Sequence, residues 1–216
     1  TTGPLLDETY IATGQVLHVF RDFPLDFHPN ALPAAQAAYC AGQQDPRLFW
    51  GMHDWLFETQ ETWSADTAGA ASFRAQALSL GADGGAYDDC VQAPETLAHI
   101  QRDLQEGAMQ GASGTPAFFV NAWFVNGAQP FEVFAETIEK AKQGLTPPPT
   151  PTPLPPNVAP YDADPARPGL TYDGSPSLGD PDARLVLIAF EDFKCGYCAQ
   201  HAMTVEPILR EKYVDS

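Results

Sequence analysis

A proline-rich segment divides the chain into two parts. Residues 145–160 read LTPPPTPTPLPPNVAP, with 8 prolines in 16 positions and no charged residue. Proline fixes φ and lacks a backbone N–H, so this segment favours an extended polyproline II spacer over a helix or a sheet ladder. A long loop inside one compact domain is the alternative, but unstructured loops of this length are uncommon. We therefore interpret residues 145–170 as a linker between residues 1–144 and residues 171–216.

The charge and the apolar runs exclude several classes of partner. The chain has 216 residues and a formal net charge of −17, of which −12 lies in residues 1–144 and −5 in the remainder. Nucleic-acid affinity comes from Lys and Arg that neutralise phosphates, so we expect no nucleic-acid partner. The longest apolar run, residues 185–190, has only the length of a strand, so we expect no membrane span. The chain begins with Thr1 and is expected to be a mature product or a fragment, which leaves secretion open.

The first part has the pattern of an α/β or α+β domain that lacks its first strand. Strands are expected at residues 15–20, 117–121 and 122–127, and helices at residues 30–42, 45–58, 72–80, 94–109 and 131–142. Asp45 and Pro46 are typical of a helix N-cap and first turn. In the helix at 94–109, the spacing predicts that Leu97, Ile100 and Leu104 face the interior.

The second part supplies a strand and one helix without a domain around them. Residues 184–190, RLVLIAF, have the pattern of a buried strand, and EDFKCGYC follows directly. An amphipathic helix is expected over residues 199–214. Each part is therefore an incomplete α/β unit.

A repeated segment offers one explanation for both incomplete parts. Residues 2–13 resemble residues 204–216 at an offset of 203, with seven like pairs in thirteen positions. This similarity favours one period cut from a tandem array, although chance similarity between two amphipathic helices is the alternative. A third possibility is a rotated domain, in which the two parts close on each other and Pro116 lies against Cys195. The repeated segment disfavours rotation, because both copies would need the same place.

The motif Cys195-Gly196-Tyr197-Cys198 lies where the expected strand passes into a helix. A cysteine in the first turn of a helix has its thiolate stabilised by free backbone N–H groups and by the helix dipole. Lys194 adds a neighbouring cation, and Cys198 follows one turn later, within reach of a disulfide. The pattern indicates a redox-active pair of cysteines.

A zinc site is the competing interpretation of these cysteines. Zinc would need two more ligands, and Cys40 and Cys90 lie fifty residues apart without a second CxxC or HxxxH. The histidines are scattered along the chain without the spacing of ligands: His18, His28, His53, His99 and His201. We therefore expect no metal. His201 could tune the cysteine pair, but a solvated helix position is favoured.

Gly114-Thr115-Pro116 precedes the strand at residues 117–121. A proline that enters a strand after a glycine-rich turn is a candidate for a cis peptide bond, with an ordinary trans turn as the default.

These features together resemble the DsbA-like disulfide oxidoreductases of the thioredoxin superfamily, which carry a helical insertion. The resemblance rests on LVLIAFEDFKCGYC, VLHVFRDFPL, LFWGMHDWLFE and GASGTPAFFVNAWFVNG, in rotated order. It implies an α/β thioredoxin-like fold with Cys195 as the exposed nucleophile and Cys198 as the buried resolving thiol. Thr115 and Pro116 would form the cis-proline loop that holds the substrate. In a tandem array, that loop would serve a CxxC upstream of the chain instead of Cys195.

Cys40 and Cys90 lie in the expected helical insertion. They could be two separate buried thiols, but the resemblance favours a structural disulfide, which would fit an oxidising compartment.

The resemblance implies an extracytoplasmic thiol–disulfide oxidoreductase that needs no cofactor. Its partners would be proteins with thiols and a redox partner that reoxidises or reduces the CGYC pair. The rival hypothesis is a noncatalytic thioredoxin-like binding or scaffold module on a proline-rich stalk.

Overall fold

The computed structural model describes residues 14–64, 69–147 and 163–214. The first part contains β1 (Val16–Asp22), α1 (Ala31–Gly42), α2 (Pro46–Glu58), α3 (Gln60–Ser64), α4 (Gly69–Leu80), α5 (Gly84–Gln92), α6 (Pro94–Gln110), β2 (Ala117–Val120), β3 (Trp123–Asn126) and α7 (Phe131–Lys142). The second part contains β4 (Ser177–Leu178), β5 (Leu185–Glu191), α8 (Gly196–Thr204), α9 (Glu206–Leu209) and the π-helical turn η1 (Arg210–Val214). The repeated segment at residues 2–13 and most of the proline-rich segment lie outside the described residues.

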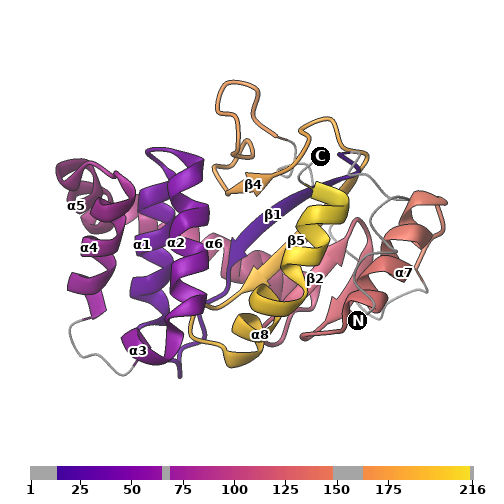
Figure 1. Ribbon diagram of the computed structural model, residues 1–216, viewed down its shortest axis with the longest axis horizontal. Helices are drawn as coiled ribbons and strands as arrows, with labels where there is room; N and C mark the ends of the chain where they lie inside the picture. Colours follow the sequence, from indigo (N-terminus) through magenta and orange to yellow (C-terminus); the bar gives the residue numbers. More distant parts are fainter. Residues whose placement is uncertain (1–13, 65–68, 148–162, 215–216) are drawn as a thin grey trace, which may run out of the picture.

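The two parts of the chain form one five-stranded sheet with the order β3-β2-β5-β1-β4 (Figure 1). The central strand β5 comes from the second part. It pairs in parallel with β1, where Val16 lies opposite Leu185, and antiparallel with β2, where Ala117 lies opposite Phe190. The two parts therefore close on each other as in the rotated domain described above. The similarity between residues 2–13 and 204–216 had disfavoured that possibility.

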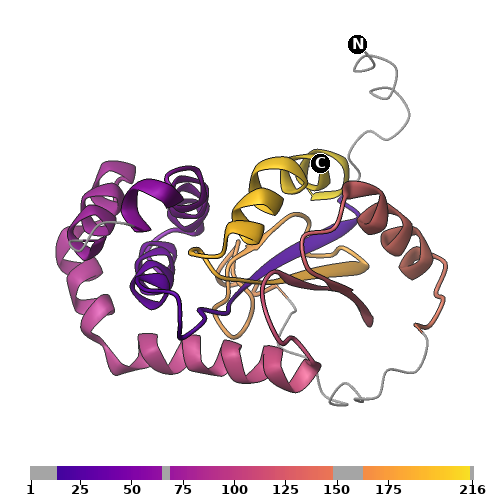
Figure 2. The same ribbon diagram turned by 90° about the horizontal axis from the view of Figure 1, so that it is seen from below.

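Strand β5 occupies the centre because its side chains are apolar on both faces. Leu185, Leu187 and Ala189 pack in the cluster that includes residues of α7 and of α9–η1. Ile188 and Phe190 belong to a cluster on the other face of the sheet. Figure 2 shows the long helix α6 on one side of the sheet and α7 and α8 on the opposite side.

Helices α1 to α5 form a helical unit beside the sheet (Figure 1). Alanine at most buried positions of α1 removes the side-chain bulk that would keep neighbouring helices apart. In α2, Phe49, Met52 and Leu56 are fully buried, as the periodicity predicts. The Asp45 carboxylate accepts a hydrogen bond from the backbone N–H of Arg47 at 2.9 Å, which confirms the expected N-cap.

The structure differs from the expected helices in three places. Helix α5 has no strong apolar periodicity, since Tyr87 is its one fully buried residue, and the pattern does not predict it. Leu97 is 38% exposed because it lies on the outer side of α6, so its expected inward position is wrong. The helix expected over residues 199–214 is divided at Val205. Pro207 lacks a backbone N–H, which interrupts the helical hydrogen bonds there.

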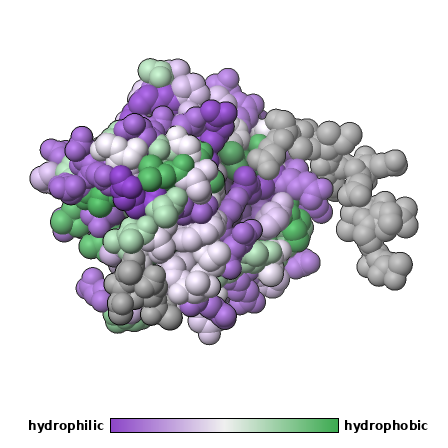
Figure 3. All heavy atoms as spheres, turned by 60° about the vertical axis from the view of Figure 1, so that its left-hand side comes forward, coloured by the Kyte–Doolittle hydropathy of each residue, from purple (hydrophilic) through white to green (hydrophobic). Residues whose placement is uncertain are grey.

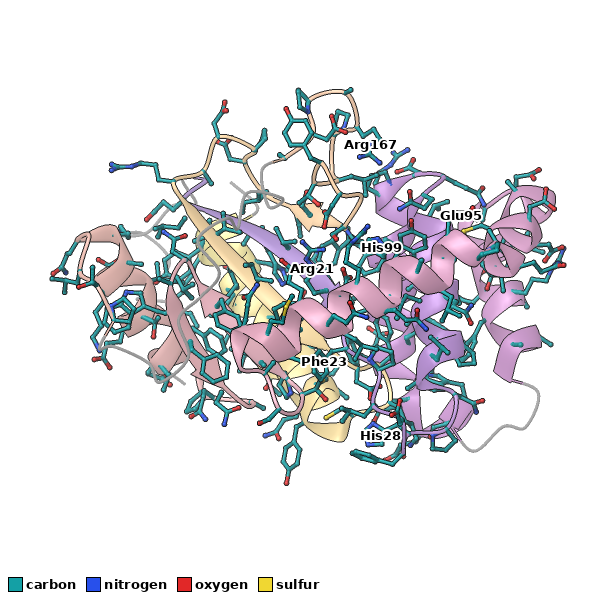
Figure 4. All side chains as sticks on the ribbon, turned by 180° about the vertical axis from the view of Figure 1, so that it is seen from behind. Arg21, Phe23, His28, Glu95, His99 and Arg167 are labelled. Carbon is teal, nitrogen blue, oxygen red and sulfur yellow. A yellow bond between two sulfur atoms is a disulfide. The ribbon has the colours of Figure 1, made fainter. Side chains whose placement is uncertain are left out.

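A buried arginine ties the second part of the chain to the sheet and to α6. Arg21 of β1 has no exposed surface, and its guanidinium donates to the Asp103 carboxylate of α6 at 2.9 Å. The same guanidinium donates to Asp173 and to the Ser175 hydroxyl, which precede β4. Figure 4 shows Arg21 beside α6. Because Leu170 is also buried, the end of the expected linker at residues 163–170 is packed against the domain.

No helix among the described residues is long and apolar enough to cross a membrane. The face in Figure 3 is mostly hydrophilic, with hydrophobic spots interspersed among polar residues.

Candidate functional site

The two cysteines of the CGYC motif lie at the junction between β5 and α8. Cys195 is the N-cap residue of α8, and Cys198 lies in its first turn. The local sequence produces this junction: the Asp192 carboxylate accepts a hydrogen bond from the Lys194 N–H at 2.7 Å, which turns the chain after the strand. Cys195 is only 6% exposed, so its expected exposed position is wrong: the thiol is covered by the surrounding loops. Cys198 is fully buried, and both cysteines are free thiols.

The loop before β2 contacts Cys195. The peptide bond between Thr115 and Pro116 is cis. The Cys195 thiol donates a hydrogen bond to the Thr115 carbonyl oxygen at 3.3 Å. The structure therefore brings together Cys195, Cys198, Thr115 and Pro116, all four of the residues that the sequence suggests for the redox site.

The two thiols have opposite electrostatic environments. A hydrogen bond from the Cys198 thiol lowers the pKa of Cys195 to about 5 against the opposing effect of burial. The Thr115 side chain and then the backbone N–H groups of Cys198 and Tyr197 lower this pKa further. Burial raises the pKa of Cys198 well above its ordinary value, and the hydrogen bond to Cys195 adds to this effect. The arrangement is suited to one stable thiolate and one protonated thiol.

Two further contacts fix the backbone of the CGYC loop. The Gln60 side-chain amide of α3 donates to the carbonyl oxygens of Phe193 at 2.7 Å and of Cys195 at 3.0 Å. The buried Asp192 carboxylate accepts the Leu25 N–H at 2.9 Å and lies 2.6 Å from His28 Nδ1. The helical unit and the loop after β1 therefore hold the cysteine loop in place, and sequence reasoning missed both contacts.

The exposed rim of the site is aromatic. Tyr197 is 68% exposed between the two cysteines in sequence, and Phe27, next to His28, is 75% exposed. Exposed aromatic side chains of this size are able to contact an apolar part of a substrate.

Glu191 is a functional candidate that sequence reasoning missed. It ends β5, is 2% exposed, and has a pKa well above its ordinary value because of burial, the neighbouring Glu206 and then Cys195. Its charge in turn raises the pKa of Cys198. The signal was present in the sequence, because Glu191 continues the alternation of the buried side chains Leu187 and Ala189.

His201 does not occupy the solvated position that the sequence favours. It is 2% exposed on the inner side of α8, with its ring centroid 4.3 Å from that of Phe118 and 5.1 Å from that of Phe134. Burial lowers its pKa to about 3, so the imidazole is neutral and packs with the aromatic core.

Cys40 and Cys90 do not belong to the CGYC motif and are bonded to each other as a disulfide. The bond joins α1 to α5 and closes a loop over a sequence separation of 50 residues. Thr96, at the start of α6, packs against both sulfurs, with its hydroxyl oxygen 3.7 Å from the Cys40 sulfur and 3.4 Å from the Cys90 sulfur. The disulfide thus links two helices of the helical unit, and the start of α6 packs against it.

The chain is similar to known proteins in sequence. A family model described as thioredoxin matches residues 2–140 and 171–216, which flank the proline-rich segment. The chain is 32% identical over 143 residues to Na(+)/H(+) antiporter NhaA 1 of Salinispora arenicola (strain CNS-205), a match that covers 65% of this chain and 21% of the antiporter. It is 30% identical over 139 residues to Na(+)/H(+) antiporter NhaA 3 of Salinispora tropica, covering 64% of this chain and 20% of that protein. The chain thus spans about a fifth of these curated relatives, and no solved structure matches it.

Proposed function

The chain belongs to the thioredoxin family, and we propose that it is a DsbA-like thiol–disulfide oxidoreductase that acts through Cys195 and Cys198. Its sheet, its helical unit and its CGYC junction form a thioredoxin-like fold. One observation carries the proposal: Cys195 caps a helix, has a pKa of about 5, and lies 3.3 Å from the carbonyl oxygen of a cis-proline loop. A lowered thiol pKa, which gives a stable thiolate as attacking and as leaving group, is the property on which disulfide exchange depends.

The reaction transfers two electrons from a substrate dithiol to the CGYC disulfide. A substrate thiolate attacks the Cys195 sulfur, the Cys195–Cys198 bond breaks, and Cys198 leaves as a thiolate that takes up a proton. The second substrate thiolate then attacks the substrate sulfur of the mixed disulfide and releases the Cys195 thiolate. The stabilised Cys195 thiolate is a good leaving group, which favours this second step. A separate redox partner accepts the two electrons and restores the disulfide.

The location and the substrates are part of the same proposal. A disulfide between Cys40 and Cys90, outside the redox site, fits an oxidising, extracytoplasmic compartment. The exposed Tyr197 and Phe27 favour unfolded or partly folded proteins, which present apolar segments beside their thiols. The antiporters that match this chain do so over about a fifth of their length, and we attach no ion transport to this chain.

Oxidation of a reduced dithiol peptide by the purified, oxidised protein tests the proposal. We expect stoichiometric oxidation by the wild type and none by Cys195→Ser. Cys198→Ser should instead be incubated with the disulfide form of the peptide. The Cys195 thiolate then attacks one peptide sulfur, the other peptide sulfur leaves as a thiolate, and the mixed disulfide should persist without Cys198 to resolve it, as mass spectrometry can detect. The paired variant Cys40→Ser/Cys90→Ser is the control, since it removes the staple but keeps the dithiol. A folded wild type that neither oxidises nor reduces the peptide would support a noncatalytic binding module instead.

A further inference from the structure

A cluster of buried ionisable side chains lies outside the cysteine pair, and the reaction above assigns no bond-forming step to it. His53 comes from α2, Glu191 from the end of β5, Glu206 from the start of α9 and His18 from β1. Each of the four is at most 3% exposed. The oxygen and nitrogen atoms that His53, Glu191 and Glu206 direct at one another all lie within 4.8 Å. Three separate elements, α2, β5 and α9, thus place potential ligands around one point.

The distances within this cluster are too long for direct hydrogen bonds. His53 Nε2 lies 3.5 Å from Glu206 Oε2 and 3.9 Å from Glu191 Oε2, and His18 Nδ1 lies 3.9 Å from Glu206 Oε1. Two atoms that each bind one ion at about 2.1 Å with tetrahedral geometry are separated by roughly 3.4 Å. The distances from His53 Nε2 to the two carboxylates are therefore closer to the separation of two ligand atoms on one metal ion than to the length of a hydrogen bond.

The tautomer of His53 also favours a bound cation. His53 Nδ1 lies 2.9 Å from the Asp54 carboxylate, so Nδ1 carries the proton and donates it. The lone pair on Nε2 is then directed at two carboxylates, and this buried atom has no hydrogen-bond partner. A carboxylate that orients a histidine whose other nitrogen binds a cation is a recurrent feature of metal sites.

The carboxylates of the cluster are not fully balanced by neighbouring cationic side chains. Arg210 is the cation that approaches it, 3.9 Å from Glu206 Oε1 and 3.7 Å from Asp54 Oδ1, and it is shared between the two carboxylates. Within the part of the chain that the structure describes, no arginine or lysine pairs with Glu191, and its Oε1 atom has no hydrogen bond. Two facing carboxylates in a dry interior require a proton or a cation between them.

We propose that His53, Glu191 and Glu206 bind one divalent transition-metal ion of the Zn²⁺ class, with Asp54 orienting His53. Carboxylate and imidazole are ligands that such ions accept, and three protein ligands leave one position for His18 or a water molecule. A pocket of about 360 Å³, lined by Asp54, Glu206 and Arg210 among others, adjoins the cluster on the side of Glu206. The scatter of the histidines in the sequence hides this site, because its ligands come from separate elements.

Metal titration of a protein without redox thiols tests the site independently of any oxidoreductase activity. In the untagged Cys195→Ser/Cys198→Ala variant, we expect calorimetry to show one Zn²⁺ per chain. Co²⁺ should give a d–d absorption band without a thiolate charge-transfer band. Glu206→Gln should abolish this binding, and Asp54→Asn should weaken it about 10- to 100-fold, as loss of an orienting carboxylate does elsewhere.

Matched surface variants make the result interpretable. Glu139→Gln and Asp88→Asn remove carboxylates that pair with Lys142 and Arg74 on the surface, and both should bind Zn²⁺ like the parent. The proposal is overturned if the parent binds no Zn²⁺, or if Glu206→Gln binds as tightly as Glu139→Gln. Either result would indicate that a shared proton holds the cluster together. If Glu206→Gln fails to fold by circular dichroism, Asp54→Asn decides, because Asp54 is half-exposed and its replacement leaves the core intact.

Discussion

The thiolate of Cys195 gives the most direct quantitative prediction. Its pKa of about 5 lies well below the 8.5 of an ordinary cysteine, so at pH 7 it should be about 99% ionised instead of about 3%. This gain of roughly 30-fold in thiolate does not give a faster reaction at pH 7. Nucleophilicity falls with pKa at a Brønsted slope of about 0.45, which over this shift offsets the gain by about 40-fold. The pH midpoint of alkylation, not the rate at neutral pH, therefore tests the structure.

The perturbation is the loss of the hydrogen bond from Cys198, the largest cause of the lowered pKa. A hydrogen bond to a charged group contributes about 1.5–3 kcal/mol, which corresponds to about 1–2 pKa units. In Cys198→Ala, the midpoint for Cys195 should therefore rise from about 5 to about 6–7. Cys198→Ser is the matched control, since its hydroxyl keeps a donor and should hold the midpoint nearer to that of the wild type.

The assay is iodoacetamide alkylation between pH 3 and pH 10, followed by the thiolate absorbance at 240 nm and by mass spectrometry. The same protein in denaturant provides the reference, where Cys195 should titrate as an ordinary thiol. A wild-type midpoint between 8 and 9, or equal midpoints in Cys198→Ala and Cys198→Ser, would refute the assigned cause.

Three predictions concern stability, each measured by urea unfolding at pH 7. Cys40→Ala/Cys90→Ala should lose about 4 kcal/mol, because the disulfide closes a loop of 50 residues in the unfolded chain; an unchanged stability would contradict this. Arg21→Met should lose about 3–5 kcal/mol, since it leaves the buried carboxylates of α6 and of the loop before β4 without their cation. Gly107→Ala should destabilise by about 1–3 kcal/mol although alanine favours helices by about 1 kcal/mol, because the added Cβ would lie 2.8 Å from ring atoms of Phe190 and Phe23. Gly114→Ala, with nothing within 4 Å of the added atom, should be neutral.

Local chemistry made parts of the site predictable. The CGYC pair follows a strongly apolar strand and precedes a helix, and these signals lie within about twenty residues. The start of α2 follows from the N-cap Asp45 and from Pro46, and α7 follows from an acidic residue in its first turn and lysines in its last turn. In such segments the local structure is determined by residues that are close together in the sequence.

Pairings between distant segments could not be predicted in this way. The apolar run of β5 indicates burial on both faces, but it carries no information about which strands lie beside it. The repeated segment favoured a different partner for Cys195, whereas the register of β5 against β1 and β2 places Thr115 beside that cysteine. The contact between Glu191 and His53 was missed for the same reason, since the two residues come from different elements.

The central position of β5 sets an order of events during synthesis. Val16 pairs with Leu185, so about 170 residues must be made before the middle of the sheet can form, which takes roughly 10–30 s at ribosomal speeds. Helices α1 to α6 consist of local contacts and are able to form in that interval. Strands β1 and β2 meanwhile have no central partner and expose apolar faces and unpaired edges. The growing chain is therefore most exposed to aggregation, and most dependent on chaperones, until Glu191 has left the ribosome.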